Sequence, residues 1–136
     1  MKVNKIEIRI SNSLEDYLEA ILIISEENNL VRITDLARFM KISKPSASEA
    51  VKSLVDIGFL RHEKYGPVEL TEEGRMRAAE VRKRHRLLKK FLTEVLEVPP
   101  AIADQDACLM EHAISADTIS QLLKFLESQV ALNESE

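Results

Sequence analysis

The chain has 136 residues, of which 45% are hydrophobic and only 4% aromatic, with a formal net charge of −4. This composition is typical of a helix-rich globular protein with one domain, or with two small domains that share a core. Because Cys108 is the only cysteine, an internal disulfide framework is excluded. We expect a cytoplasmic protein, since no apolar run approaches ~18 residues and no signal peptide is found at the N-terminus.

Two helices are predicted near the N-terminus. Apolar residues keep helical period over residues 13–28, where Ser13 would be the N-cap and Asp16 would complete a capping box. A short helix over residues 34–40 would begin at a Thr34 cap.

A third helix and a β-hairpin follow. Ser43 is predicted to cap a helix that ends at Gly58. Residues 59–65 and 68–71 are predicted to be two strands joined by a turn at Gly66 and Pro67, which indicates a hairpin. Helix, short helix, turn, helix and two-stranded wing is the order of a winged helix-turn-helix, whose third helix enters a major groove of DNA.

Several side chains of the third helix and the wing would face DNA. The helix residues are Lys44, Pro45, Ser46, Ser48, Glu49 and Lys52, and the wing residues are Arg61 and Lys64. Small hydroxyls suit base edges or phosphates, and wing cations suit phosphates, although all could be ordinary surface residues.

The second half of the chain is predicted to be entirely helical. Thr71 would cap a long helix over residues 72–96, and further helices are expected over residues 100–113 and 116–130. We therefore place a DNA-binding domain at 1–72 and a helical domain at 73–136.

Charge is distributed unevenly along the chain. Residues 75–90 contain Glu80 as their only acid, whereas residues 97–136 contain Lys124 as their only lysine or arginine. DNA binding needs a local basic face rather than a positive total, but solvated helix faces would produce the same pattern.

Three separate stretches carry residues that bind metals. Asp16 and Glu19 are three residues apart, so they share a helix face, and Cys108, Glu111 and His112 do the same. Thiolate, carboxylate and imidazole on one face indicate half of a metal site. His85, in the long helix, is a further candidate. An acid pair is often merely solvated, and a histidine between arginines is often structural.

Motifs along most of the chain resemble the diphtheria-toxin-repressor and manganese-transport-regulator family of metal-dependent repressors. The matching motifs are residues 15–19, 44–51, 63–65, 70–71, 74, 84–88, 91–92 and 106–112. The resemblance implies a mainly α protein, with an N-terminal winged helix joined to an all-helical dimerisation domain. It also implies the two-domain form, without the SH3-like domain of the iron-regulator branch.

The resemblance implies a metal site between the two domains. The residues at ligand positions of the manganese branch are Asp16, Glu19, His85, Glu111 and His112. Cys108 stands where that branch has a glutamate and the iron branch a cysteine, which puts a second ion in doubt. Lys89 and Asp104 stand where the iron branch's ancillary site has a glutamate and a histidine, and a lysine there disfavours a cation.

The donor set indicates Fe²⁺ or Mn²⁺, with a slight preference for Fe²⁺. Carboxylates suit Mn²⁺, while the Cys108 thiolate favours Fe²⁺, Co²⁺ or Zn²⁺, and Zn²⁺, Co²⁺ or Ni²⁺ are expected to bind in vitro. Metal would fix the angle between the domains and so set the two recognition helices of a homodimer ~34 Å apart on a double-stranded DNA operator. The dimer surface is expected at Leu87, Leu88, Phe91, Leu92, Ile114 and Ile119, unless these residues fill the protomer's own core.

Two other classes of function compete with this hypothesis. One is a winged-helix regulator that is not controlled by metal. The other is a metal enzyme that uses Glu111 or His112 in acid–base chemistry. The sequence contains no nucleophile motif and no glycine-rich phosphate loop, so we expect neither an enzyme nor a small organic substrate.

Overall fold

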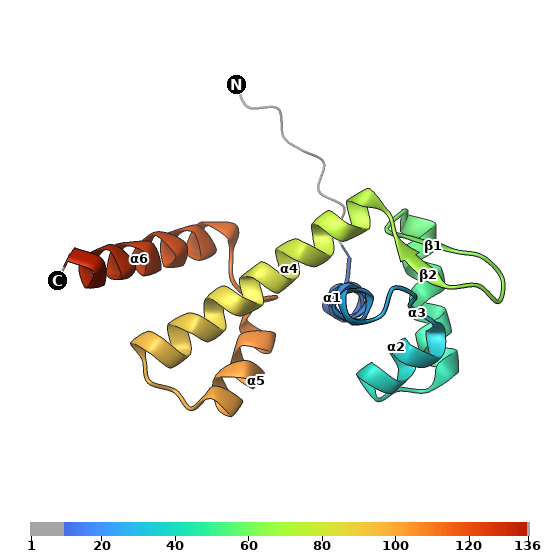
Figure 1. The fold of residues 1–136 in the computed structure, drawn as a ribbon, viewed down its shortest axis with the longest axis horizontal. Helices are drawn as coiled ribbons and strands as arrows, with labels where there is room; N and C mark the ends of the chain where they lie inside the picture. Colours follow the sequence, from blue (N-terminus) through green and yellow to red (C-terminus); the bar gives the residue numbers. More distant parts are fainter. Residues whose placement is uncertain (1–9, 136) are drawn as a thin grey trace, which may run out of the picture. The chain divides into compact units, whose positions relative to one another are not determined.

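The computed structural model describes residues 10–135, with side chains described up to residue 129. Its elements are α1 (Asn12–Glu27), α2 (Ile33–Met40), α3 (Lys44–Ile57), β1 (Leu60–His62), β2 (Val68–Leu70), α4 (Glu72–Lys90), η1 (Phe91–Val95), α5 (Pro100–Met110) and α6 (Ala116–Ser135). Figure 1 labels the α-helices and the two strands and colours the chain from its N-terminus to its C-terminus. The chain divides after Ala79, within α4, into two compact units that are described separately below.

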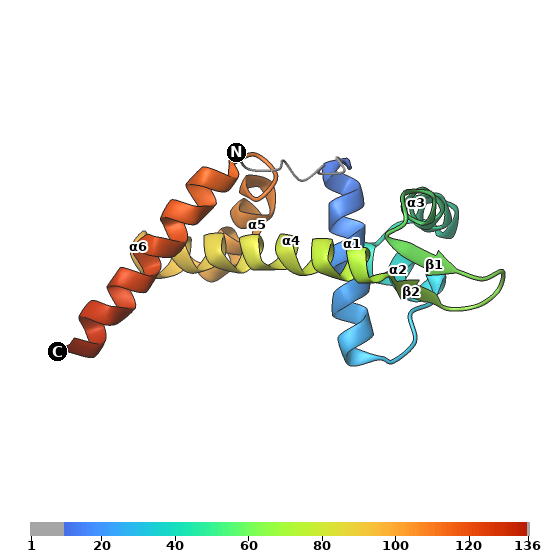
Figure 2. The same ribbon diagram turned by 90° about the horizontal axis from the view of Figure 1, so that it is seen from above.

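The first unit is the predicted winged helix. Helix α2 packs against both α1 and α3, and Figures 1 and 2 show α3 beside the hairpin. In the antiparallel hairpin, Leu60 pairs with Leu70 and Arg61 with Glu69. Val31 adds a single bridge to Val68, so the short segment between α1 and α2 borders the wing.

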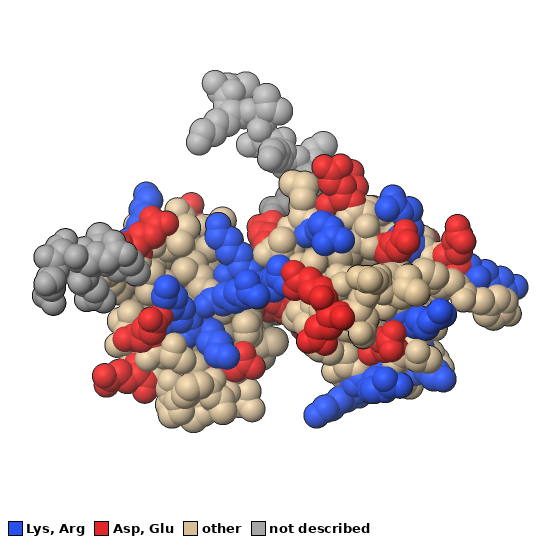
Figure 3. All heavy atoms as spheres, viewed as in Figure 1, with Lys and Arg blue, Asp and Glu red and all other residues tan. Residues whose placement is uncertain are grey.

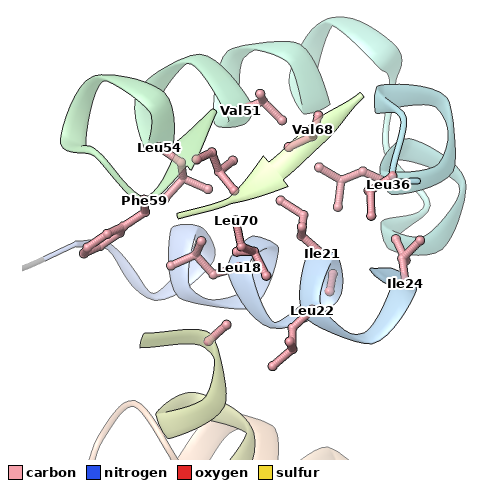
Figure 4. Close-up of a cluster of buried hydrophobic side chains, with 14 of the residues drawn as sticks. Leu18, Ile21, Leu22, Ile24, Leu36, Val51, Leu54, Phe59, Val68 and Leu70 are labelled. Atoms are coloured by element: carbon pink, nitrogen blue, oxygen red, sulfur yellow. The ribbon is translucent and has the colours of Figure 1, made fainter. Parts of the chain in front are cut away.

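The core of the first unit lies between α1, α2, α3 and the hairpin (Figure 4). Leu18 and Ile21 of α1 are fully buried, as is Leu54 of α3. Burial of each such side chain stabilises the fold by roughly 1.5–3 kcal/mol. On α3, Ala47 and Val51 are also buried, so the opposite face of this helix is left to solvent.

Two of the predicted helix caps are wrong. The N-cap of α1 is Ser11, whose hydroxyl accepts a hydrogen bond from the Leu14 N–H at 3.2 Å, whereas Ser13 already lies inside the helix. At α2, the Arg32 N–H donates to the Asp35 carboxylate at 3.0 Å, and Thr34 lies within the first turn. Several hydroxyls near each start fit the capping pattern, and the extended backbone before the helix decides which residue is the cap.

The predicted caps of α3 and α4 are confirmed. Ser43 accepts from the Ser46 N–H at 3.2 Å, and α3 ends at Gly58, whose φ of 97° favours glycine. Thr71 accepts from the Gly74 N–H at 3.1 Å and donates to the Gly58 carbonyl at 2.7 Å. A Cβ on Gly74 would lie 1.9 Å from the Phe59 carbonyl oxygen, so only glycine allows this approach.

The second unit contains the C-terminal part of α4, η1, α5 and α6. The long helix extends about as far as predicted, but its last turn is π-helical. Helix α5 ends at Met110 rather than at residue 113, because the Ala113 N–H bonds to the Met110 carbonyl in a tight turn. Helix α6 continues to Ser135 rather than 130, since no glycine or proline interrupts it.

A small apolar cluster holds the second unit together. Leu88 and Leu92 pack against Ala103 and Ala107 of α5. The partly buried residues around them are Phe91, Val98, Met110, Ile114, Ile119 and Leu122. Leu87, Leu88 and Leu92, which were predicted to form part of a dimer surface, are buried within the protomer, whereas Phe91, Ile114 and Ile119 remain partly exposed. Hydropathy alone does not distinguish a dimer surface from the core of a protomer.

Among the described residues, none of the helices combines the length and the apolar composition that a membrane span requires.

Candidate metal centre

Helix α5 and the turn after it carry a row of polar residues. Asp104, Cys108 and Glu111 are spaced by four and three residues, so they lie on one helix face. Glu111 is the C-cap of α5 with helical backbone angles, and it therefore continues that face. His112 follows it. His85 reaches the same place from α4.

Glu111 is the centre of this cluster. Its side chain is 0% exposed, and its Oε2 lies 3.0 Å from His85 Nδ1. Its Oε1 lies 3.3 Å from His112 Nε2, but this contact is not a hydrogen bond, and the oxygen has no hydrogen-bond partner within the described part of the chain. A buried carboxylate that lacks a full set of partners costs free energy, so this position is suited to a cation.

His85 lies between two carboxylates. Its Nε2 is 2.9 Å from Asp104 Oδ1, on the side of the ring opposite Glu111. Lys89, one helical turn after His85, places its Nζ 3.4 Å from the same Asp104 oxygen. The hydrogen bond with His85, more than the charges of His85 and Lys89, lowers the pKa of Asp104, against the opposing effect of burial.

Cys108 completes the donor set of the second unit. Its Sγ lies within 4.8 Å of a Glu111 carboxylate oxygen, and its side chain is half-buried. Sulfur, nitrogen and carboxylate oxygen together are a ligand set for divalent transition metals. Each of the two spacings around Glu111, 3.0 Å to His85 and 3.3 Å to His112, also matches a pair of neighbouring ligands of an ion at bond lengths of about 2.1 Å. The residues therefore fit a metal.

The structure brings four of the six predicted ligands together within the second unit, namely His85, Cys108, Glu111 and His112. The other two, Asp16 and Glu19, belong to the first unit. They lie three residues apart on α1 and therefore share a helix face, and both are half-buried.

Two features of α1, α4 and α5 were not predicted from the sequence. Asp104 counted only as a mismatch to a known site, although its spacing from Cys108 and Glu111 would have placed it on their face. The other is a buried ion pair in the first unit, in which Arg77 approaches Glu15 at 3.7 Å and also lies over the Phe59 ring. No sequence signal distinguishes Glu15 from the exposed acids of α1.

The face of α3 that was predicted to contact DNA is exposed. The exposed residues are Lys44, Pro45, Ser46, Ser48, Glu49 and Lys52, with Arg61 and Lys64 on the hairpin. Arg61 lies 3.8 Å from Glu69, but both are exposed, so the pair holds Arg61 weakly. Figure 3 shows lysine and arginine side chains at the hairpin tip and over α4, so a basic surface is present despite the negative total charge.

A winged helix followed by a cluster of transition-metal donors defines a metal-regulated DNA-binding protein. Comparison with known families agrees with this class. Residues 9–68 match the family model "Iron dependent repressor, N-terminal DNA binding domain", and residues 71–129 match "Iron dependent repressor, metal binding and dimerisation domain". The chain belongs to the iron-dependent repressor family, whose members are DNA-binding transcriptional regulators controlled by iron or manganese.

Individual relatives support this assignment. The chain is 35% identical over 119 residues to an uncharacterized HTH-type transcriptional regulator of Methanocaldococcus jannaschii, covering 87% of this chain and 95% of the relative. It is 36% identical over 114 residues to the transcriptional regulator MntR of Salmonella typhimurium, covering 84% and 72%. A manganese-dependent transcriptional repressor, solved with manganese, superposes with a TM-score of 0.77 at 31% identity. That match covers 84% of this chain and 52% of the solved chain, so this chain spans about half of its length.

Proposed function

We propose that this protein is a homodimeric repressor of metal-ion homeostasis, which binds Fe²⁺ or Mn²⁺ and then binds a DNA operator. One observation carries the proposal: the buried Glu111 carboxylate faces two imidazoles and retains an oxygen without a hydrogen-bond partner among the described residues. A divalent cation at this position would offset the cost of burying the charge. The relatives come from bacteria and an archaeon, which hold their DNA in the cytoplasm, and we place the protein there.

The two oxygens of Glu111 support two sets of ligands. Oε1, together with Cys108 and His112, would hold a first ion, to which we assign Asp16. Oε2, together with His85, would hold a second ion, to which we assign Glu19. The assignments of Asp16 and Glu19 rest on their shared helix face and on the family motif. When bound, the metal supplies positive charge and coordination bonds that hold these side chains.

Such a metal would couple the two units. Ligands that come from both units would be held together by the ion and would limit movement of the DNA-binding unit. In a homodimer, this would set two α3 helices at a spacing of about one DNA turn, ~34 Å. By linkage, metal would raise DNA affinity and DNA would raise metal affinity by the same factor, with a coupling of about 1–3 kcal/mol.

We infer that the metal is Fe²⁺ or Mn²⁺, with the Cys108 thiolate favouring Fe²⁺ and the carboxylates favouring Mn²⁺. A thiol ligand would also make the protein sensitive to oxidation. Replacing Cys108 by Ala should therefore weaken Fe²⁺ binding more than Mn²⁺ binding, and replacing it by Glu should favour Mn²⁺.

The DNA contacts would be made by α3 and the wing. Lys44 and Lys52 are exposed at the start and the middle of α3, where phosphates or base edges can reach them. Loss of either lysine should weaken binding to all sequences and reduce the salt dependence by about one counterion.

The experiment that tests the function is anaerobic DNA binding by the chelator-stripped protein, titrated with Fe²⁺, Mn²⁺ and Zn²⁺. The DNA would be the region upstream of the protein's own gene and its neighbours. We expect metal to increase specific binding in the unmodified protein and not in Glu111→Gln, which preserves shape but removes the charge. Exposed Asp106 on α5 provides the matched control Asp106→Asn. Metal-independent specific binding would instead indicate a winged-helix regulator that is not controlled by metal.

A further inference from the structure

The His85 ring is held from both sides, yet it has only one nitrogen to give to a metal ion. Nδ1 lies 3.0 Å from Glu111 Oε2, and Nε2 lies 2.9 Å from Asp104 Oδ1. A neutral imidazole carries one proton, so the nitrogen that keeps the proton donates a hydrogen bond and the other nitrogen can bind metal. The surroundings of the two nitrogens decide which one does so.

The surroundings differ in burial and in neighbouring charge. On the Nδ1 side, the carboxylate is the fully buried Glu111, which His112 also faces. On the Nε2 side, the carboxylate is Asp104, which is 55% exposed and has the Lys89 ammonium 3.4 Å away. The ammonium already supplies a positive charge beside Asp104, and it would repel a second cation at Nε2.

We propose that Asp104, itself held by Lys89, is a positioning residue that keeps the His85 proton on Nε2 and directs Nδ1 to the metal beside Glu111. A metal-binding histidine usually donates its other N–H to a carboxylate or carbonyl, and this contact fixes the tautomer and ring orientation and raises ligand basicity. Asp104 has the position and the distance for that role. The inference rests on the proposed function, because it assumes that His85 binds metal.

The pair also has a consequence for the number of sites. Asp104 and His85 Nε2 would otherwise be two ligands for a separate ion near the surface of the second unit. The Lys89 ammonium supplies the positive charge at that position. The Nε2 side of His85 is therefore a structural contact with Asp104, and the Nδ1 side is the metal site.

The test measures metal affinity and the state of the His85 ring without DNA. Mn²⁺ affinity is measured from the electron paramagnetic resonance signal of the free ion. The ring is observed by long-range ¹H–¹⁵N NMR of the full chain with Zn²⁺, which is diamagnetic, and the chain has 3 histidines to assign. The variants are Asp104→Ala, Asp104→Asn, which retains an acceptor oxygen, and Lys89→Ala, with Asp106→Ala as the matched control on the same helix.

We expect His85 in the unmodified protein to be bound through Nδ1 and protonated on Nε2. Asp104→Ala should weaken Mn²⁺ binding by about 10–100-fold, the usual range for such partners. The loss of Mn²⁺ affinity should be smaller in Asp104→Asn and smaller again in Lys89→Ala, and Asp106→Ala should bind Mn²⁺ as the unmodified protein does. Because a general loss of folding would also lower affinity, Asp104→Asn and the NMR of the Zn²⁺ complex must agree with Asp104→Ala.

Two results would overturn the inference. These are metal on Nε2 of the unmodified protein, and an Asp104→Ala affinity equal to that of Asp106→Ala. If the unmodified protein binds neither Mn²⁺ nor Zn²⁺, the proposed function fails and the inference fails with it. If the unmodified protein binds metal and the Asp104 variants bind it with the same affinity, the inference fails but the proposed function stands.

Discussion

The two units treat buried charge in opposite ways. In the first unit, the one buried acid that the described residues include is Glu15, and it is paired with Arg77 at 3.7 Å. The aliphatic core of this unit is large. In the second unit, the core cluster is much smaller, and the buried Glu111 has an oxygen without a hydrogen-bond partner among the described residues. The first unit therefore satisfies its own charge, whereas the second leaves charge that a bound cation would satisfy.

Replacing Leu54 by Ala would test the strength of the first unit's core. Leu54 is fully buried in α3, and a cavity at such a site should lower the free energy of unfolding by about 2–5 kcal/mol. Denaturant unfolding followed by circular dichroism measures the loss. Leu30→Ala, at a leucine that is 52% exposed in the same unit, should change stability by less than about 0.5 kcal/mol. Equal losses in both variants would contradict the core described above.

Metal binding should stabilise mainly the second unit. At a free Mn²⁺ concentration of about 100 times the Kd, the gain in unfolding free energy should be about 2.7 kcal/mol. Hydrogen exchange should show the added protection in α5 and in the C-terminal part of α4. Protection confined to the first unit, or the same gain in Glu111→Gln, would place the metal elsewhere.

Replacing Glu111 by Leu should separate stability from metal binding. The change removes a buried charge with an unsatisfied oxygen, and His85 loses one partner but keeps Asp104, so the metal-free protein should become more stable by about 1 kcal/mol, while metal binding should be lost. Thermal unfolding with and without Mn²⁺ measures both effects. Glu15→Leu should have the opposite sign, since it removes a carboxylate that its unit pairs with Arg77. A destabilised Glu111→Leu would show that the metal-free site is already satisfied.

Helix caps should contribute about equally to the stability of the two units. The Ser43 hydroxyl accepts the Ser46 N–H in the first unit, and the Ser115 hydroxyl accepts the Thr118 N–H in the second, each at 3.2 Å. Replacing either serine by Ala should lower the free energy of unfolding by about 1 kcal/mol. Ser13→Ala should have a much smaller effect, because Ser13 lies inside α1. A cost at Ser13 as large as at Ser43 would restore the cap predicted from the sequence.

Much of the fold could be predicted because it depends on neighbouring residues. Helical period, the Ser43 and Thr71 caps, the Gly58 stop and the hairpin around Gly66 are local patterns, and the structure contains all of them. Where several hydroxyls or carboxylates compete, as at Ser11 and Ser13, the local pattern is ambiguous and the caps were misplaced. The ends of α5 and α6 were misplaced because a turn and a missing breaker are weak signals.

The candidate site also combines features that local spacing predicts with features that only tertiary packing decides. Spacing placed Cys108, Glu111 and His112 together because a helix repeats every 3.6 residues. Only the packing of α4 against α5 brought His85 to Glu111 and Asp104, and only burial left Glu111 with an unsatisfied oxygen. Those features depend on contacts between residues far apart in the chain. Periodicity determines which residues share a face, but the energy of burying a charge depends on what that face meets.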